Sequence, residues 1–227
     1  MNTKKIAIVG AGGFGREVLW LIRECNDYAT EKTGKPLYTV VGFITNEAGD
    51  KGHLLCDEPV LGSYDWFSAH RDTYALCAVG NPRTRFSVVR HLSDVGVRFA
   101  SVIHPSARVS RYVEIGEGSV VCAGAILTTQ VKVGKHVHIN LNSTIGHDVV
   151  IGDYSTIAPG VNISGNVLIG PGCDLGTNCA IIQGLRIGSG VTVGAGAVVH
   201  RDVDANTVSV GVPAKAIKTL AKFEMPD

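Results

Sequence analysis

The residues best suited to chemistry are a histidine and an aspartate side by side, His147 and Asp148. Histidine is the side chain most often used as a general base near neutral pH. A carboxylate beside an imidazole can fix its tautomer and raise its basicity. We therefore expect His147 to take the proton from an attacking amine or hydroxyl, with Asp148 as its partner.

A second candidate site is the glycine turn at residues 10–15, Gly-Ala-Gly-Gly-Phe-Gly. It comes after the apolar run 5–9 and precedes the helical pattern 16–24, so it fits G-x-G-x-x-G between a strand and a helix. Backbone N–H groups and the helix dipole at such a turn can hold a phosphate. The other interpretation is a tight strand-to-helix turn that binds nothing.

The residues after the second predicted strand indicate the kind of nucleotide. A dinucleotide site would place an acidic side chain there, where this chain has Thr45 and Asn46. The predicted domain is also only about half the size of a dinucleotide-binding fold. We expect a mononucleotide diphosphate rather than NAD.

A six-residue repeat fills the second half of the chain. Every sixth residue from Ile103 to Val199 is aliphatic, and the fifth position of each hexad is small or β-branched except at Leu185. Glycine often occupies the second position, as at Gly116, Gly134, Gly146, Gly152, Gly170, Gly176, Gly188 and Gly194.

A strict period of six fits neither a helix, with its period of 3.6, nor an isolated strand, with its period of 2. It fits a three-sided coil in which the aliphatic side chain fills the interior, the small residue lets the chain turn, and glycine accepts strained dihedral angles. Three hexads then close an 18-residue turn, rising about 4.8 Å. The repeat would give about five to six turns. A β-sandwich with chance periodicity is the alternative.

The 18-residue turn predicts which side chains lie above one another. His147 is at the third position of its hexad, which is neither of the inward positions, and should face outward. Gly165 lies one turn above it and should leave an open gap beside the imidazole. We expect His136 and His138 to be structural.

Residues before the repeat alternate strand and helix patterns. Apolar strands are predicted at 5–9, 38–44 and 74–79, and these indicate a small doubly wound α/β sheet. The predicted domains are a Rossmann-like half domain at 1–100, an all-β helix at 101–210 and a tail at 211–227.

Composition limits the partners and the location. The 227 residues carry 21 basic and 20 acidic side chains, for a net charge of +1, so no basic surface indicates nucleic acid or a membrane. The apolar run near the start is too short for a signal peptide, and we expect a cytoplasmic protein. The six cysteines lack metal-binding spacing, so we expect no metal and mostly buried thiols.

The repeat resembles the hexapeptide-repeat acyltransferases, in which a left-handed parallel β-helix assembles as a trimer. With the glycine turn, the Gly80-Asn81 pair and the segment from Gly211 to Lys215, nearly the whole chain looks like the sialic acid O-acetyltransferase and bacillosamine-pathway group. In that group the N-terminal domain binds a nucleotide-linked sugar and the β-helix binds acetyl-CoA between subunits. The resemblance implies N-acetylation of a nucleotide-linked amino sugar in bacterial surface glycan biosynthesis.

The resemblance also implies roles for single residues. The family motif of an asparagine seven residues before a histidine and an acidic residue is met by Asn140, His147 and Asp148, with His147 as base and Asn140 as a positioning residue. The positions that match substrate contacts are Gly10, Gly12, Gly13, Phe14, Thr45, Asn46, Gly80 and Asn81. Those that match acetyl-CoA contacts are Thr156, Gly165, Thr177, Ala195, Gly196, Pro213 and Lys215.

Two departures from the group's pattern affect substrate recognition. The group often has histidine in the glycine turn where this chain has Phe14, and a pair of aspartates where it has Thr45 and Asn46. The base of the nucleotide therefore stays open.

Three other functions remain open on these residues. One histidine base could equally serve O-acetylation of a free sugar such as sialic acid. On the same fold, His136, His138 and His147 could serve as zinc ligands in a hydratase resembling γ-class carbonic anhydrases. The β-helix could also be a scaffold without catalytic activity.

Overall fold

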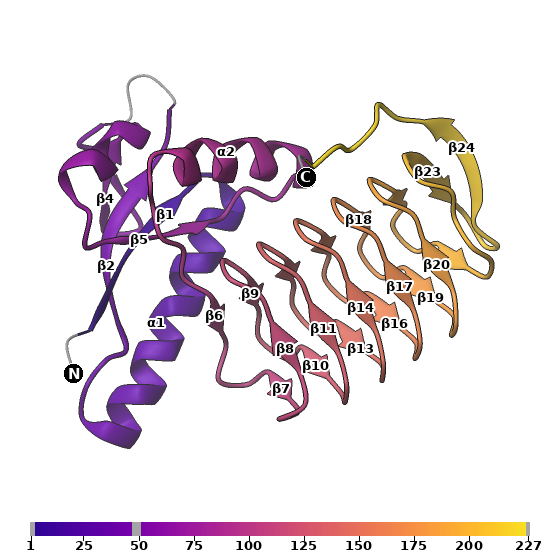
Figure 1. Cartoon of the computed structure of the whole chain (residues 1–227). Helices are drawn as coiled ribbons and strands as arrows, with labels where there is room; N and C mark the ends of the chain where they lie inside the picture. Colours follow the sequence, from indigo (N-terminus) through magenta and orange to yellow (C-terminus); the bar gives the residue numbers. More distant parts are fainter. Residues whose placement is uncertain (1–2, 47–50, 226–227) are drawn as a thin grey trace. The chain divides into compact units, whose positions relative to one another are not determined.

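The computed structural model describes residues 3–46 and 51–225, and these divide into two compact units (Figure 1). The first unit covers Met1–Gly80 and Thr84–Pro105, and the second covers Asn81–Arg83 and Ser106–Asp227, apart from the residues outside the described ranges. No helix in the described part of the chain is long and apolar enough to cross a membrane.

The first unit is an α/β domain with a mainly parallel sheet in the order β3-β4-β2-β1-β5. Its strands β1, β2, β4 and β5 run parallel, while β3 forms a short antiparallel pair with β4. The elements are β1 (Lys4–Val9), α1 (Gly13–Thr33), β2 (Tyr38–Ile44), β3 (Leu54–Leu55), β4 (Glu58–Gly62), η1 (Tyr64–Ala69), β5 (Tyr74–Cys77), α2 (Pro82–Asp94) and β6 (Val102–Ile103).

The helix predicted at 16–24 is longer in the structure, where α1 continues to Thr33. The apolar pattern thins after Ile22, but Cys25 and Ala29 carry the buried stripe on at a spacing of four residues. Gly34 then ends the helix in the left-handed conformation (φ 75°), with its N–H donating to the Thr30 carbonyl at 2.8 Å.

The second unit is a left-handed parallel β-helix, the three-sided coil that the repeat predicts with the hand that the resemblance implies, and it is built mainly from two-residue strands on three faces (Figure 1). Face A holds β9 (Val120–Val121), β12 (His138–Ile139), β15 (Thr156–Ile157), β18 (Asp174–Leu175) and β21 (Thr192–Val193). Face B holds β7 (Arg108–Val109), β10 (Ile126–Leu127), β13 (Thr144–Ile145), β16 (Asn162–Ile163), β19 (Ala180–Ile181) and β22 (Val198–Val199). Face C holds β8 (Glu114–Ile115), β11 (Lys132–Val133), β14 (Val150–Ile151), β17 (Leu168–Ile169) and β20 (Arg186–Ile187).

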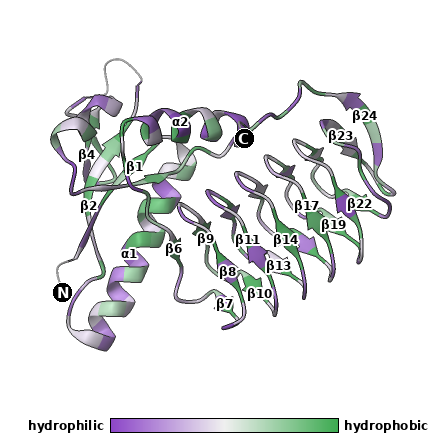
Figure 2. Cartoon of the chain, in the orientation of Figure 1, coloured by the Kyte–Doolittle hydropathy of each residue, from purple (hydrophilic) through white to green (hydrophobic). Residues whose placement is uncertain are grey.

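The interior of the β-helix is filled as the hexad predicts. Aliphatic first-position side chains such as Ile139, Ile145 and Ile157 are fully buried, and Figure 2 shows hydrophobic residues recurring along the stacked strands. The buried serines at fifth positions satisfy their hydroxyls within the stack, since Ser119 donates to the Gly134 carbonyl and Ser155 to the Gly170 carbonyl. The β-helix ends in a hairpin of β23 (Thr207–Val210) and β24 (Lys215–Thr219).

The role predicted for the second-position glycines is wrong. None of the eight has a positive φ, and the left-handed turn falls on the fourth position, where Asn142, Asp148 and Gly160 have φ between 57° and 70°. The second-position glycines are instead required by close stacking, because a Cβ on Gly152 would lie 2.4 Å from the backbone nitrogen of Pro171 in the next coil. Glycine here permits contact between successive coils and supplies no unusual dihedral angle.

We predict that Gly152→Ala destabilises the β-helix by about 2–3 kcal/mol or more, because the added methyl overlaps backbone that cannot move alone. Gly184→Asn is the matched control, since Gly184 has φ 78° with open space around it and asparagine already occupies this position in other hexads. Chemical denaturation of the purified variants measures both. Equal losses in the two variants would show that stacking does not select glycine.

Candidate active site

His147 lies on the edge where face B turns into face C, between β13 and β14. Its side chain points outward and is 56% exposed, as its third position in the hexad predicts. Nδ1 lies 2.8 Å from Oδ2 of Asp148. Because Asp148 is itself about half exposed, this pair contributes little to stability, and its main effect is to orient the imidazole.

Gly165, one coil above, is covered by the imidazole of His147. A Cβ on Gly165 would lie 2.4 Å from Nε2 and 2.5 Å from Cε1 of the ring. The expected open gap is therefore wrong, because the ring itself occupies the space that the missing side chain leaves. With Asp148 at Nδ1 and Gly165 against the ring, Nε2 is the nitrogen that remains to accept a proton, and no hydrogen bond joins it to a described residue.

Asn140 lies on a different edge, where face A turns into face B. Its side chain is buried, and Nδ2 donates to the carbonyl of Ile157 at 2.9 Å, beside the bond that its backbone N–H makes to the same carbonyl. Asn140 therefore fixes the edge of the coil that leads into β13. No hydrogen bond joins its side chain to His147, whose ring is held by Asp148 on the other edge.

The residues predicted to contact acetyl-CoA are split between these two edges. Gly165 stacks with His147 on the B–C edge, whereas Thr177, Ala195 and Gly196 come after β18 and β21 on the A–B edge and are exposed. Thr156 lies on face A and is buried. One subunit therefore does not gather these positions into a single groove.

Arg201, for which no role was predicted, lies on the same edge as His147, three coils further on. The 18-residue alignment places it about 14 Å away along the helix axis. Arg201 lines a cavity of about 220 Å³ together with Lys215, Asp202 and Asp204. Pro213 lies in the turn between β23 and β24, two residues before Lys215.

The glycine turn of the first unit begins α1 at the carboxyl edge of the sheet. Gly12 is the N-cap and has no side-chain cap, and the first turn holds no acidic residue. A Cβ on Gly15 would lie 2.0 Å from the Gly10 carbonyl oxygen, so glycine is required there, while Gly12 and Gly13 border open space. Phe14 is the second residue of α1 and is half-buried.

Four further predicted substrate positions follow strands that end at the same edge of the sheet. The N–H of Thr45, after β2, donates to the Gly62 carbonyl at 2.9 Å. The side-chain oxygen of Asn46 accepts a hydrogen bond from the N–H of Tyr64 at 3.3 Å. Gly80 and Asn81 come after β5, and both are exposed. Ligands of open α/β sheets bind at this edge, outside the carboxyl ends of the strands.

Cysteine chemistry is disfavoured by burial. Burial raises the pKa of the Cys173 and Cys179 thiols to about 12, and that of Cys25 and Cys77 to about 11. These thiols stay protonated at neutral pH, and the thiolate is the nucleophilic form. An acyl group is therefore not expected to pass through any of these four side chains.

The histidines considered as zinc ligands do not come together with a third ligand in the described part of the chain. His136 and His138 are buried, and the ring of His136 stacks on Tyr154 with centroids 5.2 Å apart. Within the described residues, no group of three His, Cys, Asp or Glu side chains is arranged to hold a metal ion.

Known protein families match both units. Residues 5–92 match the PglD N-terminal domain, residues 130–165 match the bacterial transferase hexapeptide model, and residues 113–129 and 166–201 match the hexapeptide repeat of succinyl-transferase. A curated relative, the UDP-N-acetylbacillosamine N-acetyltransferase of Bacillus subtilis (strain 168), is 33% identical over 120 residues. That match covers 53% of this chain and 52% of the relative, so it spans about half of each protein.

Solved structures match almost the entire chain. WeeI from Acinetobacter baumannii AYE is 37% identical with a TM-score of 0.82, covering 95% of this chain and 100% of that one. The acetyltransferase domain of PglB from Neisseria gonorrhoeae FA1090, in complex with acetyl coenzyme A, is 30% identical with a TM-score of 0.81 and the same coverage. PerB from Caulobacter crescentus, in complex with CoA and GDP-perosamine, is 29% identical with a TM-score of 0.83, covering 96% and 99%.

We predict that Ellman's reagent titrates one thiol per native chain, that of Cys56, and the other five only after denaturation. Cys56 is the exposed cysteine, and the other five are buried. Cys56→Ser should reduce the native titration to the background level. Rapid reaction of two or more thiols in the native protein would contradict the burial on which this prediction depends.

Proposed function

The chain belongs to the acetyltransferases that join a PglD-type N-terminal domain to hexapeptide repeats, and we propose that it transfers the acetyl group of acetyl-CoA to an amino group of a nucleotide-linked sugar. The supporting observation is the His147 imidazole, oriented by Asp148 and seated on Gly165 with Nε2 directed away from the carboxylate. Acetylation of this kind would serve surface glycan biosynthesis in the bacterial cytoplasm.

In the proposed reaction, Nε2 of His147 removes a proton from the sugar amine as its nitrogen attacks the thioester carbonyl. A C–N bond forms, the tetrahedral intermediate collapses, and the C–S bond breaks. The proton held by His147 then passes to the departing sulfur, giving CoA and an amide. Asp148 keeps Nδ1 engaged and stabilises the transient imidazolium, as a carboxylate does for other histidine bases.

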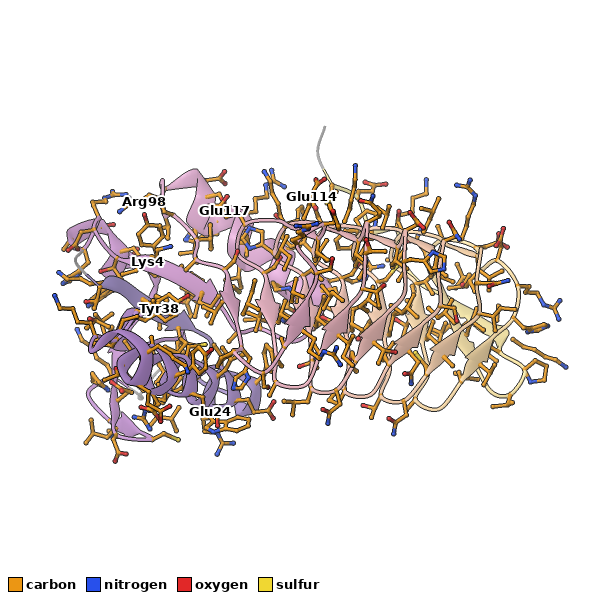
Figure 3. The ribbon with its side chains drawn as sticks, turned by 90° about the horizontal axis from the view of Figure 1, so that it is seen from below. Lys4, Glu24, Tyr38, Arg98, Glu114 and Glu117 are labelled. Atoms are coloured by element: carbon orange, nitrogen blue, oxygen red, sulfur yellow. The ribbon has the colours of Figure 1, made fainter. Side chains whose placement is uncertain are left out.

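The same proposal includes a homotrimer, supported by the surface of face B. From the second coil upward, the outward side chains of face B are uncharged: Ile126, Thr144, Asn162, Ala180 and Val198. The two polar side chains in this set, Thr144 and Asn162, share a hydrogen bond of 2.7 Å, so each already has a polar partner within the face. Face C carries Glu114, Lys132 and Arg186, and Glu114 projects from the β-helix in Figure 3. Interface cores are depleted in charged residues, which favours face B as the one directed at the threefold axis.

A threefold ring also explains why the acetyl-CoA positions lie on two edges. Cyclic trimers join two different surfaces of the same chain at each interface. With face B toward the axis, the B–C edge of one subunit, with His147, would face the A–B edge of the next, with Thr177, Ala195 and Gly196. Acetyl-CoA would lie between them, with its thioester at His147 and its phosphates toward Arg201 and Lys215.

We predict that the purified protein releases CoA from acetyl-CoA only when one particular nucleotide-linked amino sugar is present. A panel of UDP-, dTDP- and GDP-linked amino sugars, followed by thiol release in the Cys56→Ser background, measures this. His147→Gln should lower kcat by about 10²–10⁴-fold, because the contribution of a general base is of this order. Acetyl-CoA binding should be retained, since the substitution removes a base and not a phosphate contact.

The controls separate the proposed reaction from its alternatives. Gly165→Ala, which leaves the imidazole and Asp148 intact but displaces the ring, should lose most of the same activity. Equal turnover in wild type and His147→Gln would exclude His147 as the base. Turnover on free sialic acid, with no nucleotide-linked amino sugar accepted, would replace N-acetylation with O-acetylation. No CoA release with any acceptor would favour a scaffold without catalytic activity.

A further inference from the structure

Arg85, in the first turns of α2, is the largest fully buried side chain of the described chain, at 0% exposure. Arginine is almost never buried to this extent unless its donors are matched. Its Nη1 donates to two successive backbone carbonyls, of Val79 at 2.7 Å and of Gly80 at 2.9 Å. The guanidinium thus holds the loop between β5 and α2 from the inside.

These two hydrogen bonds also set the direction of the N–H groups in the loop. In a trans peptide the N–H points opposite to the carbonyl of the same peptide plane. Because Arg85 draws both carbonyls inward, the N–H groups in those planes, of Gly80 and Asn81, point away from the guanidinium. Successive N–H groups turned to one side form an anion-binding concavity. Gly80 is exposed, and a Cβ there would meet nothing within 4 Å.

The loop lies beside the glycine turn at the carboxyl edge of the sheet. The N–H of Ala78 donates to the Val9 carbonyl at 2.8 Å, and a Cβ on Gly10 would lie 3.2 Å from the Ala78 carbonyl oxygen. The glycine turn begins α1, and the N-terminus of a helix favours an anion. Gly12 has no side-chain cap, and the first turn of α1 holds no acidic residue that would oppose one. The glycine turn and the β5–α2 loop therefore lie next to each other along this edge of the sheet.

We propose that Arg85 is a positioning residue for the nucleotide-linked substrate, holding the β5–α2 loop so that its N–H groups face the diphosphate. This inference rests on the proposed function, because the diphosphate belongs to that substrate. Arg85 does not touch the ligand in this account and acts only through the loop. Lysine is not equivalent, because an ammonium on a flexible stem lacks the rigid planar donor fork that fixes two carbonyls together.

The test is calorimetric titration of UDP, dTDP and GDP into the full-length wild type, Arg85→Lys and Leu92→Ala, with CoA titrated into each as a second ligand. Leu92 is fully buried on the same helix. Its truncation destabilises the unit without touching the loop, so it controls for a loss of stability alone. Thermal midpoints of all three proteins, and kcat and KM for the nucleotide sugar, complete the comparison.

Arg85→Lys should weaken binding of the preferred nucleoside diphosphate by about tenfold or more, as expected when charge-assisted hydrogen bonds that fix a site are lost. KM for the nucleotide sugar should rise more than kcat falls, and CoA affinity should not change. Leu92→Ala should lower the thermal midpoint but bind the nucleotide as the wild type does.

Nucleotide affinity within twofold of wild type in Arg85→Lys would overturn the inference, as would an equal loss in Leu92→Ala. A wild type that binds CoA but none of the three nucleotides would instead overturn the proposed substrate class, and the role of Arg85 with it. The two failures are distinguishable because the first leaves wild-type binding intact.

Discussion

The structure depends on the close stacking of coils that repeat every 18 residues. At the edges the backbones approach so closely that a Cβ on Gly146 or Gly152 would overlap the chain above. This constraint fixes the alignment of side chains between coils and makes each edge a column of defined residues. The His147 ring can lie against Gly165 because of that alignment, and the same column leads to Arg201.

The sequence predicted the β-helix well because a strict hexad has few structural solutions. Ile139 and Ile157 are buried where the period places them, and His147 faces outward. It predicted the purpose of the glycines poorly, since a glycine needed for strained dihedrals and one needed for close stacking look the same in a sequence. The open gap expected at Gly165 was wrong for a related reason. The 18-residue spacing identifies Gly165 as the neighbour of His147, but it does not give the rotamer that places the His147 ring against that glycine.

The first unit was less predictable because its site depends on contacts that no local pattern encodes. The glycine turn was recognisable from Gly10, Gly12 and Gly15, but the end of α1 was not, since residues 25–33 are largely polar and only Cys25 and Ala29 continue the buried stripe. Arg85 has no sequence signature at all. It would be taken for a solvated charge on α2, yet its side chain is wholly enclosed and bonded to the adjacent loop.

The central claim is that each active site combines the His147 edge of one subunit with the Ala195 edge of the next. The most direct test is co-expression of differently tagged His147→Ala and Ala195→Trp chains, with isolation of the assemblies that contain both. Each parent should be inactive, and mixed trimers should regain about a third of the wild-type activity, because a ring that holds both chains pairs two intact edges at one interface of its three. Mixed assemblies as inactive as their parents would show that each subunit carries its own complete site and would contradict this account.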